Sequence, residues 1–180
     1  MAKILFVGPT CSGKGTQAKL LKKYGYTHLS SGDLIRESKD PEIVSYRESN
    51  DYKNGILLSD KLLFEILEKN LKKTSKKYIL DGFIRNTDQA KYAKKKDLIN
   101  LVFYFELDKE TAVKRGLNRL KLEKRTDDTI KGLEGKFIVY EKKTLPMIAY
   151  LKKNFELYTL DAKKSIEEIH QEVKEILGLK

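Results

Sequence analysis

Hydrophobic and polar positions along the chain fall into two alternating patterns. Short apolar runs, typical of buried strands, alternate with longer segments in which apolar residues recur every three or four positions, as on one helix face. The strand-like runs are residues 4–7, 78–80, 101–105 and 157–160, with a weaker one at 27–29. Because strands that alternate with helices need crossover connections, the pattern predicts an α/β fold: a parallel five-stranded sheet with helices on both faces.

Two local signals refine the expected helices. In the helical stripe over residues 166–176, Ser165 followed three positions later by Glu168 predicts a capping box at the start of the helix. Pro146 lies inside a helical pattern that runs from about 136 to 153. Since proline removes a backbone donor and clashes with the preceding turn, we expect a kink or a break there.

Composition limits the domain count and the compartment. A chain of 180 residues that is 40% hydrophobic can bury one core but not two ordinary enzyme cores, so we expect one domain over 1–180. The single cysteine, Cys11, cannot form an internal disulfide, and no apolar run reaches membrane-spanning length. We therefore expect a cytoplasmic protein without a membrane partner. The net charge of +11 favours anionic partners, whether nucleotides, nucleic acid or anionic lipid.

A glycine-rich loop follows the first strand directly. Residues 8–17 read Gly-Pro-Thr-Cys-Ser-Gly-Lys-Gly-Thr-Gln, and a helical pattern begins after them. Glycines let backbone N–H groups approach a phosphate, a helix N-terminus adds its dipole, and Lys14 adds a mobile positive charge. The strand, loop and helix together predict a phosphate-binding loop for ATP, in a sheet of the P-loop NTPase type.

The residue after Lys14 departs from the general pattern of such loops. It is Gly15, and the hydroxyl comes one position later, at Thr16. Without a hydroxyl at the usual magnesium position, Mg²⁺ must be held by the nucleotide phosphates, water and a carboxylate. Asp81, at the end of a predicted strand, is the candidate, acting through a water molecule; a turn cap before Gly82 is the alternative.

At five segments the chain resembles the adenylate kinase family, and especially its short-lid members. The order and spacing of the segments fit that family. The segments are Gly13-Lys14-Gly15-Thr16-Gln17, residues 29–36 (Leu-Ser-Ser-Gly-Asp-Leu-Ile-Arg), residues 54–60 (Asn-Gly-Ile-Leu-Leu-Ser-Asp), residues 81–85 (Asp-Gly-Phe-Ile-Arg) and an arginine series that ends in Arg125-Thr126-Asp127-Asp128.

The resemblance implies roles for matching residues. Those implied to bind ATP are Gly13, Lys14, Gly15, Thr16, Gln17, Arg115, Arg119 and Ala162. Those implied to bind AMP are Ser31, Gly32, Arg36, Ile56, Leu58, Gly82, Arg85 and Gln89. Those implied to act in catalysis, by spreading charge during phosphoryl transfer, are Lys14, Arg85, Arg119, Arg125 and Lys136. Asp127 and Asp128 would orient lid arginines, with a helix N-cap as the alternative.

Three departures from the family pattern stand at the implied site. Lys136 occupies a position where the family normally has arginine, Ile84 replaces its usual proline, and Thr10-Cys11 replaces its usual proline-glycine pair. Exchanging a planar guanidinium for a point charge at Lys136 weakens bidentate phosphate contacts. The interval between Arg119 and Arg125 has no room for a longer lid and no cysteine cluster, so we expect no structural zinc.

The acceptor base is inferred from the residues implied to read its edge. The Gln89 amide can accept from the amino group of adenine and donate to a ring nitrogen, and adenine-specific members carry glutamine at that position. The Ser31 hydroxyl also favours AMP. Asn86, directly after Arg85, looks more like the pyrimidine enzymes, so UMP/CMP kinase remains the alternative.

The implied reaction is the reversible, Mg²⁺-dependent transfer ATP + AMP = 2 ADP. An anionic phosphate oxygen attacks without a general base, and His28 and His170 are interpreted as structural. The acceptor-binding segment (about 31–60) and the lid (about 116–136) should close before transfer to exclude water. We expect a monomer that binds ATP and AMP but no nucleic acid. An ATP-dependent nucleic-acid-binding protein is the rival class, although its tyrosines form no organised stacking platform.

Overall fold

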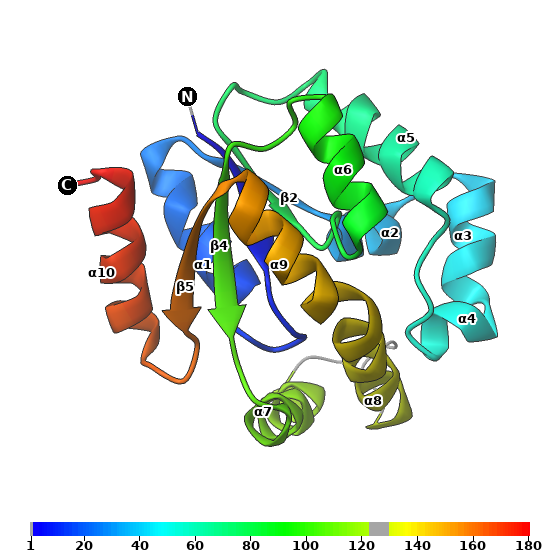
Figure 1. The fold of residues 1–180 in the computed structure, drawn as a ribbon. Helices are drawn as coiled ribbons and strands as arrows, with labels where there is room; N and C mark the ends of the chain where they lie inside the picture. The colour runs from blue at the N-terminus through cyan, green and yellow to red at the C-terminus, as the bar shows by residue number, and fades with distance from the viewer. Residues whose placement is uncertain (1, 123–129) are drawn as a thin grey trace.

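A five-stranded sheet forms the centre of the protein. The computed structural model describes residues 2–122 and 130–180 (Figure 1). The strands are β1 (Lys3–Val7), β2 (Thr27–Ser30), β3 (Tyr78–Asp81), β4 (Leu101–Glu106) and β5 (Glu156–Asp161). Their order is β2-β3-β1-β4-β5, and every neighbouring pair is parallel. The predicted P-loop NTPase-type α/β fold is confirmed.

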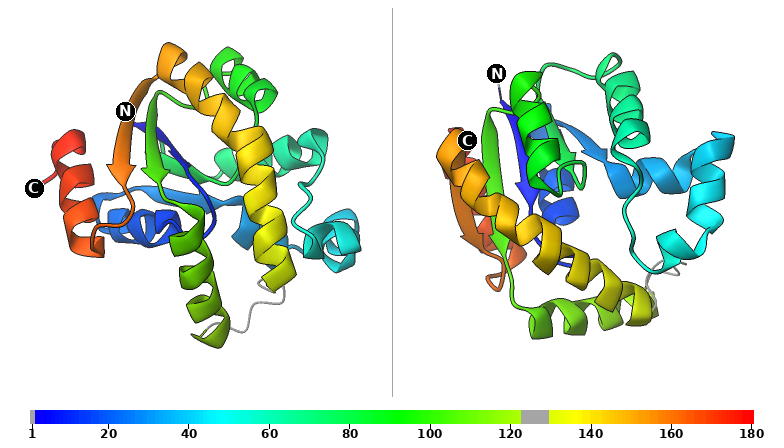
Figure 2. Two further views of the ribbon diagram at one scale, coloured as in Figure 1. Left: turned by 60° about the horizontal axis from the view of Figure 1, so that its bottom comes forward. Right: turned by 45° about the vertical axis from the view of Figure 1, so that its right-hand side comes forward.

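Helices cover both faces of the sheet. The helical elements are α1 (Lys14–Leu21), η1 (Lys22–Tyr24), α2 (Ser31–Glu37), α3 (Pro41–Glu48), α4 (Asn50–Lys53), α5 (Asp60–Leu71), α6 (Thr87–Lys95), α7 (Lys109–Leu122), α8 (Ile130–Val139), η2 (Tyr140–Thr144), α9 (Leu145–Asn154) and α10 (Ile166–Leu177). α1 packs with α10, and α6 packs with α9 on the opposite face (Figure 2). The chain leaves β1 and β3 in opposite directions along the sheet. Because crossovers between parallel strands are right-handed as a rule, the two connections place their helices on opposite faces.

The depth of each strand in the core accounts for the strength of its apolar pattern in the sequence. β1 and β4 lie in the interior of the sheet, where Phe6 and Phe103 are fully buried and meet edge to face at 5.7 Å between ring centroids. β2 and β5 are edge strands with many partly exposed positions. An edge strand buries fewer side chains, and so the apolar run at 27–29 is weak in sequence.

Both helix signals are confirmed. The Ser165 side chain accepts from the backbone of Glu168, whose carboxylate accepts from the backbone of Ser165, so the capping box begins α10. Before Pro146, the regular helix α8 gives way to a π-helical segment, η2, and α9 then begins with the proline in its first turn. The surplus residue in the π-helical turn supplies the break that the proline predicted.

The side on which successive strands join the sheet changes at β1. The connection from β1 leads to β2, beyond β3, whereas β4 lies on the other side of β1. In open parallel sheets such a switch creates a crevice at the carboxyl ends of the strands. In Figure 1 this end is the lower one, and α7 and α8 extend below it while α2, α3 and α4 lie to the side.

Candidate functional site

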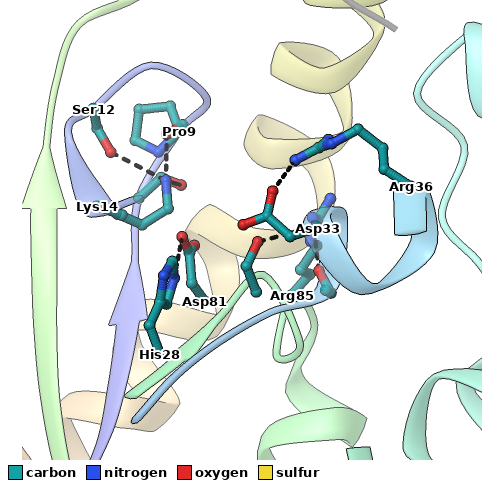
Figure 3. Close-up of polar contacts among 11 residues, drawn as sticks. Pro9, Ser12, Lys14, His28, Asp33, Arg36, Asp81 and Arg85 are labelled. Atoms are coloured by element: carbon teal, nitrogen blue, oxygen red, sulfur yellow. Dashed lines mark hydrogen bonds and ion pairs between the residues drawn. The ribbon is translucent and has the colours of Figure 1, made fainter. Parts of the chain in front are cut away.

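A cavity of about 420 Å³ lies at the carboxyl ends of β1 and β3. Its lining includes most of the residues singled out in the sequence: Gly13, Lys14, Gly15, Thr16, Ser31, Gly32, Arg36, Ile56, Leu58, Asp81, Gly82, Arg85, Arg115, Arg119 and Lys136. Figure 3 shows Lys14 on one side and Arg36 with Arg85 on the other, with Asp81 between them and His28 next to Asp81. The cavity therefore has two basic sides that face each other.

Lys14 begins α1 and folds back over the phosphate loop. Its ammonium donates to the carbonyl oxygens of Gly8 (2.9 Å) and Pro9 (2.6 Å) and to the Ser12 hydroxyl (3.1 Å). Burial lowers the pKa of Lys14; the nearby Asp81 opposes the shift, and Arg85 adds to it. A phosphate would be a stronger acceptor than these neutral oxygens, so Lys14 is available to turn toward one.

The loop itself depends on unusual backbone angles. Gly13, the N-cap of α1, has φ = 90° and brings no side chain to the cap. A Cβ atom on Gly8 would stand 2.5 Å from the carbonyl oxygen of Phe105, so glycine is required there. Cys11 has φ = 61°, a left-handed conformation that costs about 1–2 kcal/mol for a residue other than glycine. The α1 N-terminus thus faces the cavity, as an anion site requires.

Asp81 stands between the two basic sides. Its carboxylate lies 3.5 Å from Nε2 of His28, on the neighbouring strand β2. Burial alone would raise the pKa of Asp81, but His28 and the Lys14 charge outweigh this and hold that pKa below its usual range. A buried, ionised carboxylate beside a phosphate loop fits Mg²⁺, which prefers oxygen ligands and keeps much of its water. His28 itself lines the cavity, so its interpretation as a purely structural residue stays a prediction.

Arg85 is held from several directions. Its Nε donates to the carbonyl oxygen of Gly82 (2.7 Å), and Nη2 is 3.5 Å from the Ser31 hydroxyl. The Arg85 carbonyl oxygen accepts from the Thr144 hydroxyl at 2.9 Å. Burial lowers the pKa of Arg85 and Asp81 opposes this, yet a guanidinium keeps its charge. A Cβ on Gly82 would stand 2.5 Å from the Ser31 oxygen, so Gly82 must be glycine for this contact to form.

Arg36 reaches the same side of the cavity from α2. Its guanidinium forms an ion pair with Asp33, one turn earlier in the helix. The backbone N–H of Asp33 donates to the Ser30 hydroxyl (3.2 Å), which caps α2. Charge from Arg36 and these hydrogen bonds overcome the effect of burial and lower the pKa of Asp33. Arg36 and Arg85 together offer two planar groups suited to one phosphate.

A second cavity, of about 400 Å³, opens between the phosphate loop and α10. Arg115 lines both cavities, and its Nη1 donates to the Ala162 carbonyl oxygen at 2.8 Å. Gln17 lines only the second cavity: its Nε2 donates to the Ile166 carbonyl oxygen at 2.8 Å, and its Oε1 lies 3.1 Å from Nδ1 of His170. The Gln17 side chain thus joins α1 to α10, and His170 has a structural contact there.

Comparisons with known proteins agree with this geometry. The model of the adenylate kinase family matches residues 6–156. An adenylate kinase of Prochlorococcus marinus (strain MIT 9301) is 35% identical over 179 residues, which cover 96% of each chain. The chain belongs to the adenylate kinase family. A UMP-CMP kinase of Gallus gallus is 32% identical over 186 residues (96% of this chain, 95% of the relative), and one of Sus scrofa is 32% identical over 188 (97% and 96%).

The residues that the adenylate kinase family implies for the lid are partly described. Arg119 on α7 and Lys136 on α8 both line the larger cavity. Arg125, Asp127 and Asp128 lie outside the described residues. The acceptor-binding segment approaches α8 closely, since a Cβ on Gly135 would stand 2.1 Å from the Asn54 carbonyl oxygen.

Gln89 is the one implied AMP-binding residue that does not line the cavity. It is 1% exposed in the first turn of α6. Its Oε1 accepts from the backbone N–H of Arg85 at 2.6 Å, and its Nε2 donates to the Asp60 carboxylate at 2.7 Å. A role in reading the acceptor base stays a prediction.

Several site residues carried no signal in the sequence. Thr144, the last residue of η2, is buried and donates to the Arg85 carbonyl oxygen. Tyr46 and Tyr52 line the cavity, with ring centroids 5.4 Å apart, and the Tyr46 hydroxyl donates to the Ile56 carbonyl oxygen at 2.7 Å. Burial raises the pKa of Tyr46 to about 12, so it stays a donor. Long-range packing creates these contacts, and a local pattern does not record it.

Two searches over residues 2–122 and 130–180 gave negative findings. No helix there is long and apolar enough to cross a membrane. No group of three or more His, Cys, Asp or Glu side chains there could hold a metal ion. The expected absence of a structural zinc stays a prediction.

Proposed function

We propose that this protein is an adenylate kinase that catalyses the reversible transfer of the terminal phosphoryl group of ATP to AMP, forming two ADP. Adenylate kinases and UMP-CMP kinases are nucleoside monophosphate kinases, and this chain belongs to their family. The observation that carries the proposal is the pair of basic sides in one cavity, with Lys14 opposite Arg36 and Arg85. Two phosphates that must exchange a phosphoryl group need such a site.

On the donor side, the phosphate loop and the α1 N-terminus bind the ATP phosphates. Lys14 exchanges its loop carbonyl partners for phosphate oxygens, which relieves the cost of its burial. Arg115 and Arg119 neutralise charge that develops during transfer. The adenine lies in the second cavity, between Arg115 and the segment that begins at Ala162.

On the acceptor side, Arg36 and Arg85 bind the monophosphate and aim one of its oxygens at the donor. That oxygen is already anionic, so the reaction needs positioning and charge neutralisation but no general base. Arg85 is held in place by Gly82, Ser31 and Thr144. Little reorganisation of Arg85 is then required when AMP binds.

Asp81 would hold Mg²⁺ through a water molecule in this proposal. Its carboxylate is buried beside the loop and has a low pKa, as a ligand for a hard cation requires. When bound, Mg²⁺ would neutralise part of the phosphate charge. His28 keeps the carboxylate in place from β2.

We propose further that residues 1–180 act as one catalytic domain and as a monomer. Its acceptor-binding segment (about 31–60) and lid (about 116–136) close over the substrates. The approach of Asn54 to Gly135 supports a closed arrangement, since it joins the first segment to α8. Closure excludes water, which would otherwise attack the same phosphorus.

UMP/CMP kinase activity is the second candidate. UMP-CMP kinases of Gallus gallus and Sus scrofa are each 32% identical to this chain. Asn86, directly after Arg85, resembles the residue of the pyrimidine enzymes and favours this candidate, although it also caps α6 by accepting from the Gln89 backbone N–H at 2.8 Å. The mechanism would be unchanged, and only the base would differ.

The test is ADP formation from Mg-ATP with AMP, CMP, UMP, GMP and dTMP offered separately. We expect AMP to give the highest kcat/KM. Arg85→Ala should lower it by roughly a thousandfold for the preferred acceptor, because a phosphate contact made in the transition state is lost. Lys91→Ala removes an exposed cation from α6, the helix that follows Arg85, and is the matched control.

Each outcome separates two candidates. Preference for CMP or UMP would keep the chemistry and replace AMP as the acceptor. Transfer to none of the five would contradict the proposal that the protein is a nucleoside monophosphate kinase. Equal losses of kcat/KM in Arg85→Ala and Lys91→Ala would show that Arg85 does not bind the acceptor.

A further inference from the structure

The C-terminal end of α2 is held by a side chain from the next helix. The C-cap of α2, Ser38, is extended (φ = −64°, ψ = 139°), so the helical hydrogen bonds stop there. The last carbonyl oxygens of a helix have no N–H partner within it. Nη1 of Arg47, on α3, donates to the Arg36 carbonyl oxygen at 2.6 Å. The same nitrogen donates to the carbonyl oxygens of Ser38 (3.1 Å) and Ile35 (3.2 Å), so Arg47 caps α2 from outside the helix.

A guanidinium suits this position better than a neutral donor. It keeps its positive charge, and the C-terminal end of a helix carries the negative end of the helix dipole. Hydrogen bonds from a charged donor are also stronger than those between neutral groups. Arg47 is half-buried, so water competes less for its hydrogens. Since Arg47 does not line the cavity, its contacts hold the end of α2 and do not serve a substrate directly.

The end of α2 that Arg47 holds carries Arg36. The nearest of the three acceptors is the carbonyl oxygen of Arg36 itself, and the Arg36 side chain lines the cavity. That side chain forms an ion pair with Asp33, one turn earlier in the helix. At the other end, the Ser30 hydroxyl caps the start of α2. The helix is therefore fixed at both ends, by Ser30 and by Arg47.

A helix as short as α2 depends on such anchors. It has seven residues, whereas isolated helices shorter than about 12 residues are marginal in water. Without Arg47, the last turn would lose its charged donor and fray, and the backbone of Arg36 lies in that turn. The hydrogen bonds of a planar guanidinium depend on direction, so a small displacement of Arg36 weakens its contact with a phosphate.

We propose that Arg47 is a positioning residue of the acceptor side: it fixes the last turn of α2 and thereby places the Arg36 guanidinium for the acceptor phosphate. The inference rests on the proposed function, in which Arg36 binds that phosphate. It does not depend on the base, because every nucleoside monophosphate carries the same phosphate group. Arg47 acts through Arg36 and does not touch the acceptor.

The test is a double-mutant cycle, since such a cycle measures whether two residues act through each other. Steady-state kinetics gives kcat, KM for the preferred monophosphate and KM for Mg-ATP in the unmodified protein, Arg47→Ala, Arg36→Ala and the double variant. Arg47→Lys, which keeps a charged donor, tests for rescue. Lys39→Ala removes an exposed cation from the connection between α2 and α3 and is the control. Urea titration of each variant measures its stability.

We expect Arg47→Ala to raise KM for the monophosphate by roughly tenfold, with kcat retained and KM for Mg-ATP unchanged, because a binding contact of the acceptor alone is weakened. Arg47→Lys should recover part of this loss. In the Arg36→Ala background, Arg47→Ala should raise the same KM by less than about twofold, since the group that Arg47 places is already absent. Lys39→Ala should leave all three constants unchanged.

Two results would overturn the inference and leave the proposed function intact. An unchanged KM for the monophosphate in Arg47→Ala, with or without a loss of stability in urea, would assign Arg47 a purely structural role. A rise in KM that is equally large in the Arg36→Ala background would show that Arg47 does not act through Arg36. Transfer to no monophosphate by the unmodified protein would overturn the inference and the proposed function together.

Discussion

The donor and acceptor sides of the cavity are built in different ways. The donor side is mostly one continuous segment, residues 8–16, whose backbone and Lys14 all face the cavity. The acceptor side is assembled from α2, the segment 55–58, the segment 82–85 and Thr144. A phosphate chain can be bound by repeated backbone donors, whereas a particular base and its phosphate need side chains that converge from several elements.

The largest effect should come from removing the charge of the donor side. Lys14→Met keeps the length of the side chain but loses its ammonium, and kcat should fall by roughly a thousandfold because transition-state charge is no longer neutralised. AMP affinity, measured by calorimetry, should stay unchanged if the two sides are independent. Lys22→Met, an exposed change just after α1, is the control. An equal loss of AMP affinity would show that the sides are coupled.

Gly135→Ala tests the contact that joins the acceptor side to α8. The added carbon would stand 2.1 Å from the Asn54 carbonyl oxygen, so the two segments must separate. We expect kcat/KM for AMP to fall by roughly ten- to a hundredfold, while alanine itself favours the helix. Steady-state kinetics measures the loss of activity, and circular dichroism measures the helix content. Glu134→Ala, exposed on α8, should have full activity; full activity in Gly135→Ala would mean that the contact is not needed.

The pH dependence of stability reports on Asp81, which lies between the two sides. The pKa of Asp81 is below its usual value of 3.8 in the folded protein. This carboxylate therefore stabilises the fold above that pH, and the stabilisation is lost as pH falls through 3.8 and below. Asp81→Asn should flatten the decline in the free energy of unfolding between neutral and acidic pH, measured by urea titration. Asp88→Asn, an exposed change, should leave the decline as it is; identical curves for all three proteins would contradict the role of Asp81.

The smallest effect should come from the loop backbone. Cys11→Gly places glycine at φ = 61°, which relieves a left-handed conformation while making the unfolded chain more flexible. The net result should be a gain of about 0.5–1 kcal/mol in the free energy of unfolding. A loss of stability would show that the Cys11 side chain, whose Sγ lies 3.7 Å from the Thr10 hydroxyl, contributes more than its strain costs.

The same contrast explains what could be predicted from the sequence. The strands, the connection of β1 to α1 through the glycine-rich loop and the α10 capping box follow from neighbouring residues, and these local structures are confirmed. The approach of Lys14 to Arg85 across one cavity follows from the parallel sheet, which brings strand ends together. The contact of Thr144 with Arg85 spans 59 positions and depends on a π-helical turn. No local pattern encodes such a contact.

The prediction that Gln89 reads the acceptor base rests on the chemistry of its amide and on its position after Arg85. The hydrogen bond from Gln89 to Asp60 could not be predicted, because no local pattern relates α6 to the start of α5. Which end of an amide faces a substrate depends on every neighbour of that amide. This information exists only after α5 and α6 have packed.

The π-helical segment η2 separates the rotational phases of two helices that are continuous in the chain. An α-helix advances about 100° per residue, so one surplus residue rotates everything after it by that angle. α8 can therefore present Lys136 to the cavity while α9 buries Met147 and Leu151. If η2 were one residue shorter, either Lys136 would turn away from the cavity or Met147 and Leu151 would turn away from the core. The length of this segment is thus as much a functional property as any side chain in it.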